Sequence, residues 1–186
     1  MRKTIQLNSS CICIMTSHTV FRFPSRTGFA DLVSAQEKIP SISKHEVLIK
    51  VRAVSLNSRD IQVATGKYPA YVKENVIPGS DAAGDIVDIG EDVRDLAKGD
   101  RVVVSFDIAH MYGPQKDFST CQGGGFDGVL AQYIARPASS VVKVPASAPQ
   151  TYSELASLVC TGVTSWNALY GNMPLKPGQT VLVQGS

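Results

Sequence analysis

The feature that most constrains the fold is a stretch punctuated by glycines, Ile77 to Val102, which reads IPGSDAAGDIVDIGEDVRDLAKGDRV. Between the glycines, apolar and polar residues alternate as in half-buried strands, with Ala83, Ile86 or Val87, Ile89, Val102 and Val104 on the apolar side. The chain is expected to turn at Gly90-Glu91-Asp92 and Lys98-Gly99-Asp100, because glycine reaches positive φ without steric cost and Asp hydrogen-bonds within its own turn. The pattern predicts paired strands inside a β-barrel.

Strand patterning continues on both sides of this stretch. Thr19 to Phe23 and Asp31 to Ile39 predict a first hairpin, and the run VLIKVRAVSL at residues 47–56 predicts a central strand. A long irregular segment, residues 105–127, carries three consecutive glycines near its end; loops of this length are usually functional or mobile. Strand patterning then returns over residues 128–136 and 140–144.

Two regions have helical signals. Asn57 or Ser58 is a predicted N-cap for a short helix that ends at Gly66. After a linker at residues 145–149, Thr151 and Glu154 fit a capping box, and apolar residues then recur at helical spacing as far as residue 170, with a break expected at Gly162. The run TVLVQ at residues 180–184 predicts a strand of a parallel sheet that is buried on both faces.

Composition limits the classes of partner. The chain has 186 residues, 44% of them apolar, and a net charge of +2, so it can build a core and offers no basic run for nucleic acid. No segment reaches the roughly 20 apolar residues that a membrane span needs. Four scattered cysteines favour a reduced, cytoplasmic setting over a disulfide framework. We expect a small-molecule substrate, no nucleic acid and no membrane, and a disordered extension over residues 1–18.

Six motifs occur in an order and spacing that resemble one superfamily: VLIKVRAVSLNSRD, PGSDAAGDIVDIGEDV, GDRV, GFDGVLAQYIARP, LASLVCTGVTSWNAL and KPGQTVLVQGS. They resemble the medium-chain dehydrogenases/reductases, in the quinone-oxidoreductase and zinc-independent alcohol-dehydrogenase-like branch. The resemblance implies a mainly β (α+β) fold, with a GroES-like, partly open β-barrel over residues 19–149. It also implies the truncated start of a Rossmann α/β nucleotide-binding domain over residues 150–186, with the reaction in the cleft between the two.

The same resemblance bears on metal. Where zinc-dependent members read Cys-Gly-Thr-Asp and Pro-Gly-His-Glu, this chain reads NSRD at 57–60 and PGSD at 78–81, and only Cys160 occupies a ligand-like position. A catalytic zinc site needs three protein ligands, and a structural site needs four closely spaced ones, whereas residues 105–127 offer only Cys121. We therefore expect no metal site.

Without zinc, the oxyanion that develops during hydride transfer must be stabilised by hydrogen bonds. The resemblance makes Asn57 the first catalytic candidate, with an ordinary helix cap as the alternative role. Tyr68 and Tyr71 lie in GKYPAY, a loop that lines the substrate cleft in the family, so either phenol is a candidate donor or a packing residue.

The cofactor implied by the resemblance is NADP(H), and the candidates to contact it are Thr161, Thr164 and Gly185. A dinucleotide fingerprint requires G-x-G-x-x-G after a strand, and the chain reaches only Gly185. We expect the 186 residues alone neither to bind NADP(H) tightly nor to be active.

Three functions are weighed. The first is the N-terminal part of a zinc-independent, NAD(P)H-dependent oxidoreductase that acts on a quinone, an enone or a small aldehyde or alcohol. The second is a non-catalytic folded or interaction module, and the third is a fragment of a zinc-type alcohol dehydrogenase. Self-association is expected because apolar helices and an unpaired strand edge invite partners.

Overall fold

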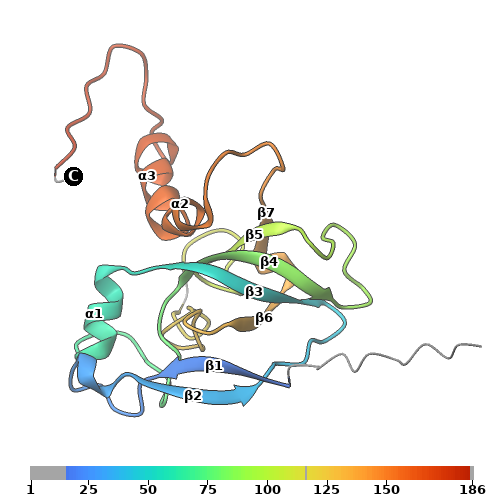
Figure 1. Ribbon diagram of the computed structural model, residues 1–186. Helices are drawn as coiled ribbons and strands as arrows, with labels where there is room; N and C mark the ends of the chain where they lie inside the picture. The colour runs from blue at the N-terminus through green and yellow to red at the C-terminus, as the bar shows by residue number, and fades with distance from the viewer. Residues whose placement is uncertain (1–15, 116, 185–186) are drawn as a thin grey trace, which may run out of the picture.

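The computed structural model describes residues 16–115 and 117–184 and is built around one curled antiparallel sheet (Figure 1). Its strand order is β6-β3-β4-β5-β7. The strand bounds are β3 Glu46–Ser55, β4 Asp81–Ile89, β5 Arg101–Val104, β6 Tyr133–Pro137 and β7 Val141–Lys143. The predicted central strand is therefore confirmed as β3, which pairs with both β4 and β6.

A second, two-stranded sheet partly closes the barrel below the first. It consists of β1 Ser17–Arg22 and β2 Val33–Lys38, which pair antiparallel as the sequence predicts. The Phe21 amide donates to the Leu130 carbonyl at 3.0 Å, and the Tyr133 amide donates to Nδ1 of His18 at 3.2 Å. Strand β1 begins at Ser17, two residues before the predicted start at Thr19. His18 is buried and contacts Tyr133 of β6. The predicted extension is thus too long by these strand residues, and its residues 1–15 lie outside the described residues.

The barrel interior holds the main apolar core. Its members come from the predicted alternating positions of several strands and include Val20, Val47, Ile49, Ile86, Val102, Val104, Val129 and Ile134. Val87, the other residue of the predicted pair, is 36% exposed, which assigns the inward position to Ile86. Alternation at period two thus selects the buried face correctly.

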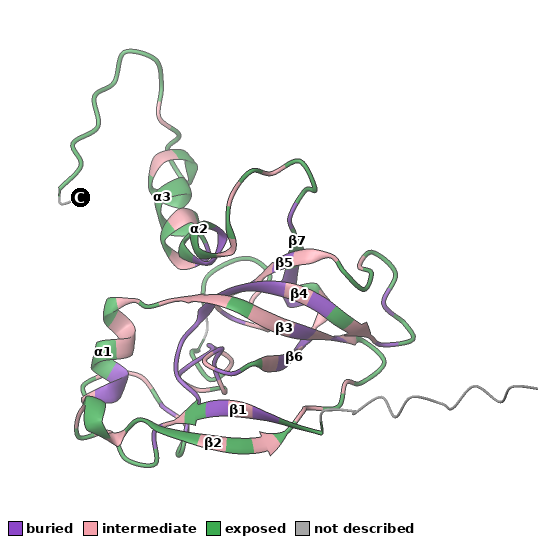
Figure 2. Cartoon of the chain, in the orientation of Figure 1, coloured by how far each residue is buried: buried purple, intermediate pink, exposed green. Residues whose placement is uncertain are grey.

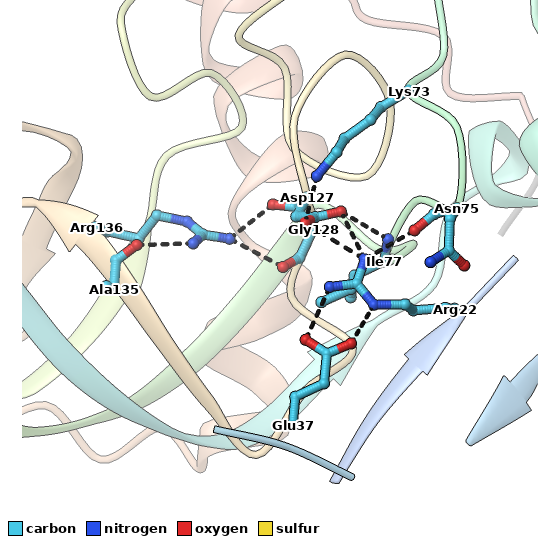
Figure 3. A network of polar contacts seen from close by, with 9 residues as sticks. All are labelled: Arg22, Glu37, Lys73, Asn75, Ile77, Asp127, Gly128, Ala135 and Arg136. Carbon is cyan, nitrogen blue, oxygen red and sulfur yellow. Dashed lines mark hydrogen bonds and ion pairs between the residues drawn. The ribbon is translucent and has the colours of Figure 1, made fainter. Parts of the chain in front are cut away.

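Asp127, which follows the three glycines at 123–125, binds groups from two other segments of the chain (Figure 3). Its carboxylate accepts hydrogen bonds from Lys73 Nζ at 2.7 Å, from the Ile77 amide at 3.0 Å and from Arg22 Nη1 at 3.2 Å. Arg22 also pairs with Glu37 across the first hairpin. The network joins β1, the segment before β4 and the end of the irregular loop.

Three α-helices flank the barrel: α1 Ser58–Ala64, α2 Tyr152–Ser157 and α3 Cys160–Tyr170. There are also two 3₁₀ turns, Phe29–Asp31 and Ala138–Ser140. The predicted capping box before α2 is confirmed, since the Thr151 amide donates to Glu154 Oε2 at 2.7 Å and the Glu154 amide to Thr151 Oγ1 at 3.3 Å. The break lies at Leu158 and Val159, so its predicted position at Gly162 is wrong. Leu155 and Ala156 at the end of α2 and Val159 in the break are all buried.

The predicted strand at residues 180–184 is not formed. Val181, Leu182 and Val183 are 45, 82 and 76% exposed, and the segment runs away from the barrel beyond the equally exposed helix α3 (Figure 2). A strand of a parallel sheet needs at least one hydrogen-bonding neighbour, and the described residues provide none for it. Among all the helices of residues 16–115 and 117–184, none is long and apolar enough to cross a membrane.

Candidate functional site

The candidate site forms where β3 ends and β4 begins. Ser55 and Asp81 are paired across these two antiparallel strands, so the residues just after Ser55 lie beside the residues just before Asp81. Asn57 is the N-cap of α1, and its backbone amide donates to Asp60 Oδ2 at 2.8 Å. The side-chain Nδ2 of Asn57 is buried and has no acceptor among the described residues. The predicted cap is confirmed, and it leaves the side-chain NH₂ group of Asn57 free to donate to a ligand.

The first residue of α3, Cys160, contacts the start of β4 at Asp81. Asp81 is fully buried, and its Oδ1 accepts from the Ser80 hydroxyl at 2.6 Å while its Oδ2 accepts from the Cys160 amide at 2.9 Å. Burial, followed by the negative charge of Asp81, raises the pKa of the Cys160 thiol. The sequence motifs at 57–60, at 78–81 and around Cys160 therefore converge, although more than 100 residues separate the first from the last.

Arg59 is a residue of this site that the sequence reasoning did not single out. Its guanidinium carbon lies 4.8 Å from the ring centre of Tyr68 and 4.9 Å from that of Phe106. Nη1 donates to the Gln122 carbonyl at 2.6 Å, whereas Nε and Nη2 are buried without an acceptor among the described residues. Gly124, in the run of three glycines, makes room for this arginine, because a Cβ there would overlap Arg59 Nη2.

Asp60 contributes the other unpaired atom. Its Oδ1 is buried without a donor among the described residues. Burial raises the pKa of Asp60, and the hydrogen bond from the Asn57 amide and the charge of Arg59 offset that increase only in part. The site therefore combines a neutral amide, a cation and a carboxylate whose negative charge is disfavoured.

An apolar groove of about 590 Å³ opens next to this cluster, between the sheet and the last two helices. Phe106, Cys160 and Thr164 contribute to its lining, together with apolar residues that include Val104, Val144, Leu155, Leu158 and Val163. A mostly apolar cleft with few polar groups is typical of small-molecule sites.

The remaining predicted site residues are placed as follows. Tyr68 is half-buried and stacks on Arg59, whereas Tyr71 is 65% exposed and does not join the cluster. The hydroxyls of Thr161 and Thr164 donate to the carbonyls of Ser157 and Cys160, one helical turn before them. Thr164 lines the groove and Thr161 does not. Gly185 lies outside the described residues.

The donor set of this site does not fit catalytic zinc. Asn57 and Ser80 replace the stronger ligands, and both oxygens of Asp81 already accept hydrogen bonds. Within residues 16–115 and 117–184, no group of three His, Cys, Asp or Glu side chains is arranged to hold a metal ion.

The irregular loop is organised around a carboxylate. Asp107 accepts hydrogen bonds from the Thr120 hydroxyl at 2.7 Å, the Ala109 amide at 2.9 Å and the Gln115 side chain at 2.7 Å. Burial alone would raise the pKa of Asp107, but these hydrogen bonds outweigh it and lower the pKa to about 2. The Cys121 thiol also donates to Asp107, and burial followed by this bond raises its pKa to about 12.

Comparison with known proteins agrees with this geometry. The family profile of the alcohol dehydrogenase GroES-like domain matches residues 43–146. The chain belongs to this family, and it corresponds to the N-terminal part of medium-chain dehydrogenases/reductases.

Among curated proteins, it is 39% identical over 165 residues to a zinc-type alcohol dehydrogenase-like protein of Schizosaccharomyces pombe, covering 86% of this chain and 47% of that protein. It is 32% identical to the crotonyl-CoA carboxylase/reductase of Cereibacter sphaeroides, covering 79% of this chain and 37% of that protein. The chain thus spans about half the length, or less, of these relatives.

Solved structures confirm the GroES-like fold. A thermostable alcohol dehydrogenase from Pyrobaculum aerophilum aligns with a TM-score of 0.69 at 25% identity, over 83% of this chain and 47% of that one. A quinone oxidoreductase from Pseudomonas syringae aligns with a TM-score of 0.67 at 22% identity, over 87% of this chain and 43% of that one, and supports the fold alone.

Proposed function

We propose that this chain is the substrate-binding, N-terminal part of an NADP(H)-dependent oxidoreductase that transfers hydride to or from a quinone, an enone or a small aldehyde or alcohol without zinc. The observation that carries the proposal is the buried Nδ2 of Asn57, which has no partner among the described residues. By the motif resemblance, Asn57 stands where zinc-dependent members carry a cysteine. A buried donor without an acceptor is costly unless a ligand supplies one.

In this proposal the side-chain Nδ2 of Asn57 donates a hydrogen bond to the substrate oxygen, where negative charge develops. NADP(H), when bound, supplies or accepts the hydride. The apolar groove excludes water from the reacting atoms, and Thr164, which lines it, is the better placed of the two threonine candidates for cofactor contact. NADP(H) is favoured over NAD(H) on the family resemblance alone.

The test uses the longer protein in which we propose that this chain occurs. Replacing Asn57 by Ala should lower kcat by about 100-fold, by analogy with the loss of one oxyanion donor. The variant loses the side-chain half of the capping box, at a cost of about 1 kcal/mol, and keeps the half in which the Asn57 backbone donates to Asp60. An Asn57→Ala enzyme that is folded and fully active would refute the assigned role.

Metal dependence separates this function from a zinc-type alcohol dehydrogenase. Oxidation of NADPH by a quinone or an enone should persist after treatment with a strong zinc chelator, and added Zn²⁺ should not increase it. Loss of activity on chelation with recovery on zinc addition would instead support the zinc-type alternative, which the name given to the fission-yeast relative suggests.

The 186-residue chain itself is proposed to be inactive and to bind NADPH weakly, since residues 180–184 form no strand on which a phosphate-binding turn could be built. Titration of the purified chain with NADPH tests this, and micromolar affinity would contradict it. We place the protein in the cytoplasm, consistent with the buried free thiol of Cys121.

A second candidate, an interaction module, is favoured by the exposed apolar surface of α3 and the tail. Trp166, Met173 and Leu182 are 69, 88 and 82% exposed. We propose that copies of the 186-residue chain associate through this surface. Sedimentation should show a concentration-dependent increase in mass that Trp166→Ser with Leu182→Ser abolishes; a monomer at high concentration would contradict the proposal.

A further inference from the structure

We propose that Arg59 is a specificity-determining residue that binds a carboxylate of the substrate through its Nε and Nη2 edge. The inference rests on the proposed function and narrows its substrate class to carbonyl or unsaturated compounds that carry a carboxylic acid.

The free edge of the guanidinium has the geometry for such a ligand. Nη1 is engaged by the Gln122 carbonyl, so the two buried atoms without an acceptor among the described residues are Nε and Nη2. The N–H groups of these two atoms point along one side of the guanidinium in parallel. Two parallel donors match the two oxygens of a carboxylate, whereas a single carbonyl oxygen would leave one of them unsatisfied.

The guanidinium is also held in place before any ligand binds. Tyr68 and Phe106 lie within 5 Å of its carbon, and Gly124 leaves room for Nη2 that a side chain would fill. An arginine whose plane is fixed loses little conformational entropy when it pairs with an anion. These contacts come from three separate segments of the chain, which distinguishes the arrangement from a surface arginine.

The nearby acids form no ion pair with this cation in the described part of the chain. Asp60 Oδ2 is bound to the Asn57 amide, and both oxygens of Asp81 are bound to Ser80 and to the Cys160 amide. Two buried N–H donors without an acceptor are unfavourable, and an anionic ligand would remove that cost.

The groove gives a route to this edge and limits the charge of the ligand. Phe106 lines the groove, and its ring centre lies 4.9 Å from the guanidinium carbon of Arg59, so a single ring links the groove to Arg59. In this proposal the ligand reaches Arg59 past that ring. A carboxylate is favoured over phosphate because only two donors are free, and because Asp60 and Asp81 lie close enough to repel a dianion.

The test follows two signals in the ¹⁵N-labelled chain during titration with crotonate: the Nε–H resonance of Arg59, and the backbone amide resonance of the adjacent Gly124, which also reports binding in variants that lack Arg59. Methyl crotonate is the neutral matched probe, and inorganic phosphate tests the other oxyanion. Crotonate should shift both resonances saturably, methyl crotonate should not, and phosphate should bind more weakly. Arg59→Lys keeps the charge but loses the fork, and should weaken crotonate binding by on the order of tenfold or more.

Two further variants complete the design. Gly124→Ala should weaken crotonate binding because its Cβ displaces Nη2, whereas Arg52→Lys, which alters an exposed arginine paired with Asp85, should not. No shift with crotonate, an equal shift with phosphate, or unchanged binding by Arg59→Lys would each overturn the proposal. The proposed function fails by a different readout, namely no zinc-independent oxidation of NADPH by the longer protein with any quinone or enone, carboxylated ones included, and that result would leave the Arg59 resonance shift with crotonate unaffected.

Discussion

Replacing Asp127 by Ala tests whether the loop network holds the barrel closed. The substitution removes the acceptor of the Ile77 amide, which belongs to a buried residue, and the partner of Lys73 (Figure 3). Loss of a partner for a buried donor costs about 1–3 kcal/mol, and the half-exposed ion pair adds up to about 1 kcal/mol. Arg22 keeps Glu37 and adds little. We expect the free energy of unfolding to fall by about 2–3 kcal/mol.

Thermal unfolding followed by circular dichroism measures the effect. A loss of this size should lower the Tm by roughly 5–10 °C for a chain of this length. Asp127→Asn, which keeps an acceptor for the Ile77 amide, should cost about 1 kcal/mol or less. Asp88→Ala is the matched control, because Asp88 pairs with Lys98 at the same 2.7 Å but on the surface, where such a pair contributes little.

The pH dependence provides a second readout. Burial would raise the pKa of Asp127, but the hydrogen bonds from Lys73 and the Ile77 amide and the charge of Arg22 outweigh burial and lower it. The stabilisation is therefore complete above the unfolded pKa of about 3.9 and is lost as the pH falls through the lower, folded pKa. Asp127→Ala should reduce this acid-dependent loss. Equal destabilisation by Asp127→Ala and Asp88→Ala would refute the reasoning.

Three other predictions concern separate parts of the molecule. Gly124→Ala should reduce the free energy of unfolding by about 1–3 kcal/mol, measured by urea denaturation, because its Cβ overlaps Arg59; no change would mean that the loop adapts freely. Burial lowers the pKa of His18, so stability should fall as the pH drops below about 6.5. His18→Gln should remove that slope, and a persisting slope would assign it elsewhere. Cys121, whose pKa is raised to about 12, should react with iodoacetamide only on unfolding, as mass spectrometry of peptides would show; labelling of the native chain would contradict this.

The barrel could be predicted from sequence because its information is local. Alternation at period two identifies β3, β4 and β5, and the capping residues Asn57 and Thr151 mark where helices begin. The predicted strand at 180–184 failed for the opposite reason. Its apolar, β-branched composition is suited to a buried sheet, but a strand exists only with neighbours, which no local pattern can provide.

The site was predictable only in part, because its contacts join residues distant in sequence. Family motifs located Asn57, Ser80, Asp81 and Cys160, and the structure brings their segments together. Arg59 was not singled out, since its environment depends on Tyr68 in one loop, Phe106 after β5 and Gln122 in another loop. No local sequence pattern shows whether an arginine on a short helix is exposed to solvent or packed between two aromatic rings, as Arg59 is.

The three consecutive glycines connect the barrel, the loop and the site through packing rather than flexibility. A Cβ at Gly123 would lie 2.6 Å from the Gly79 carbonyl oxygen, one at Gly124 would overlap Arg59, and one at Gly125 would overlap the Ser119 backbone. Each glycine therefore permits a close approach to a different segment. Because Gly79 immediately precedes Ser80 and Asp81, the approach at Gly123 fixes the loop against the start of β4, while Gly124 leaves room for Arg59. The same run of glycines thus closes the barrel and shapes the site in which we propose that the substrate binds.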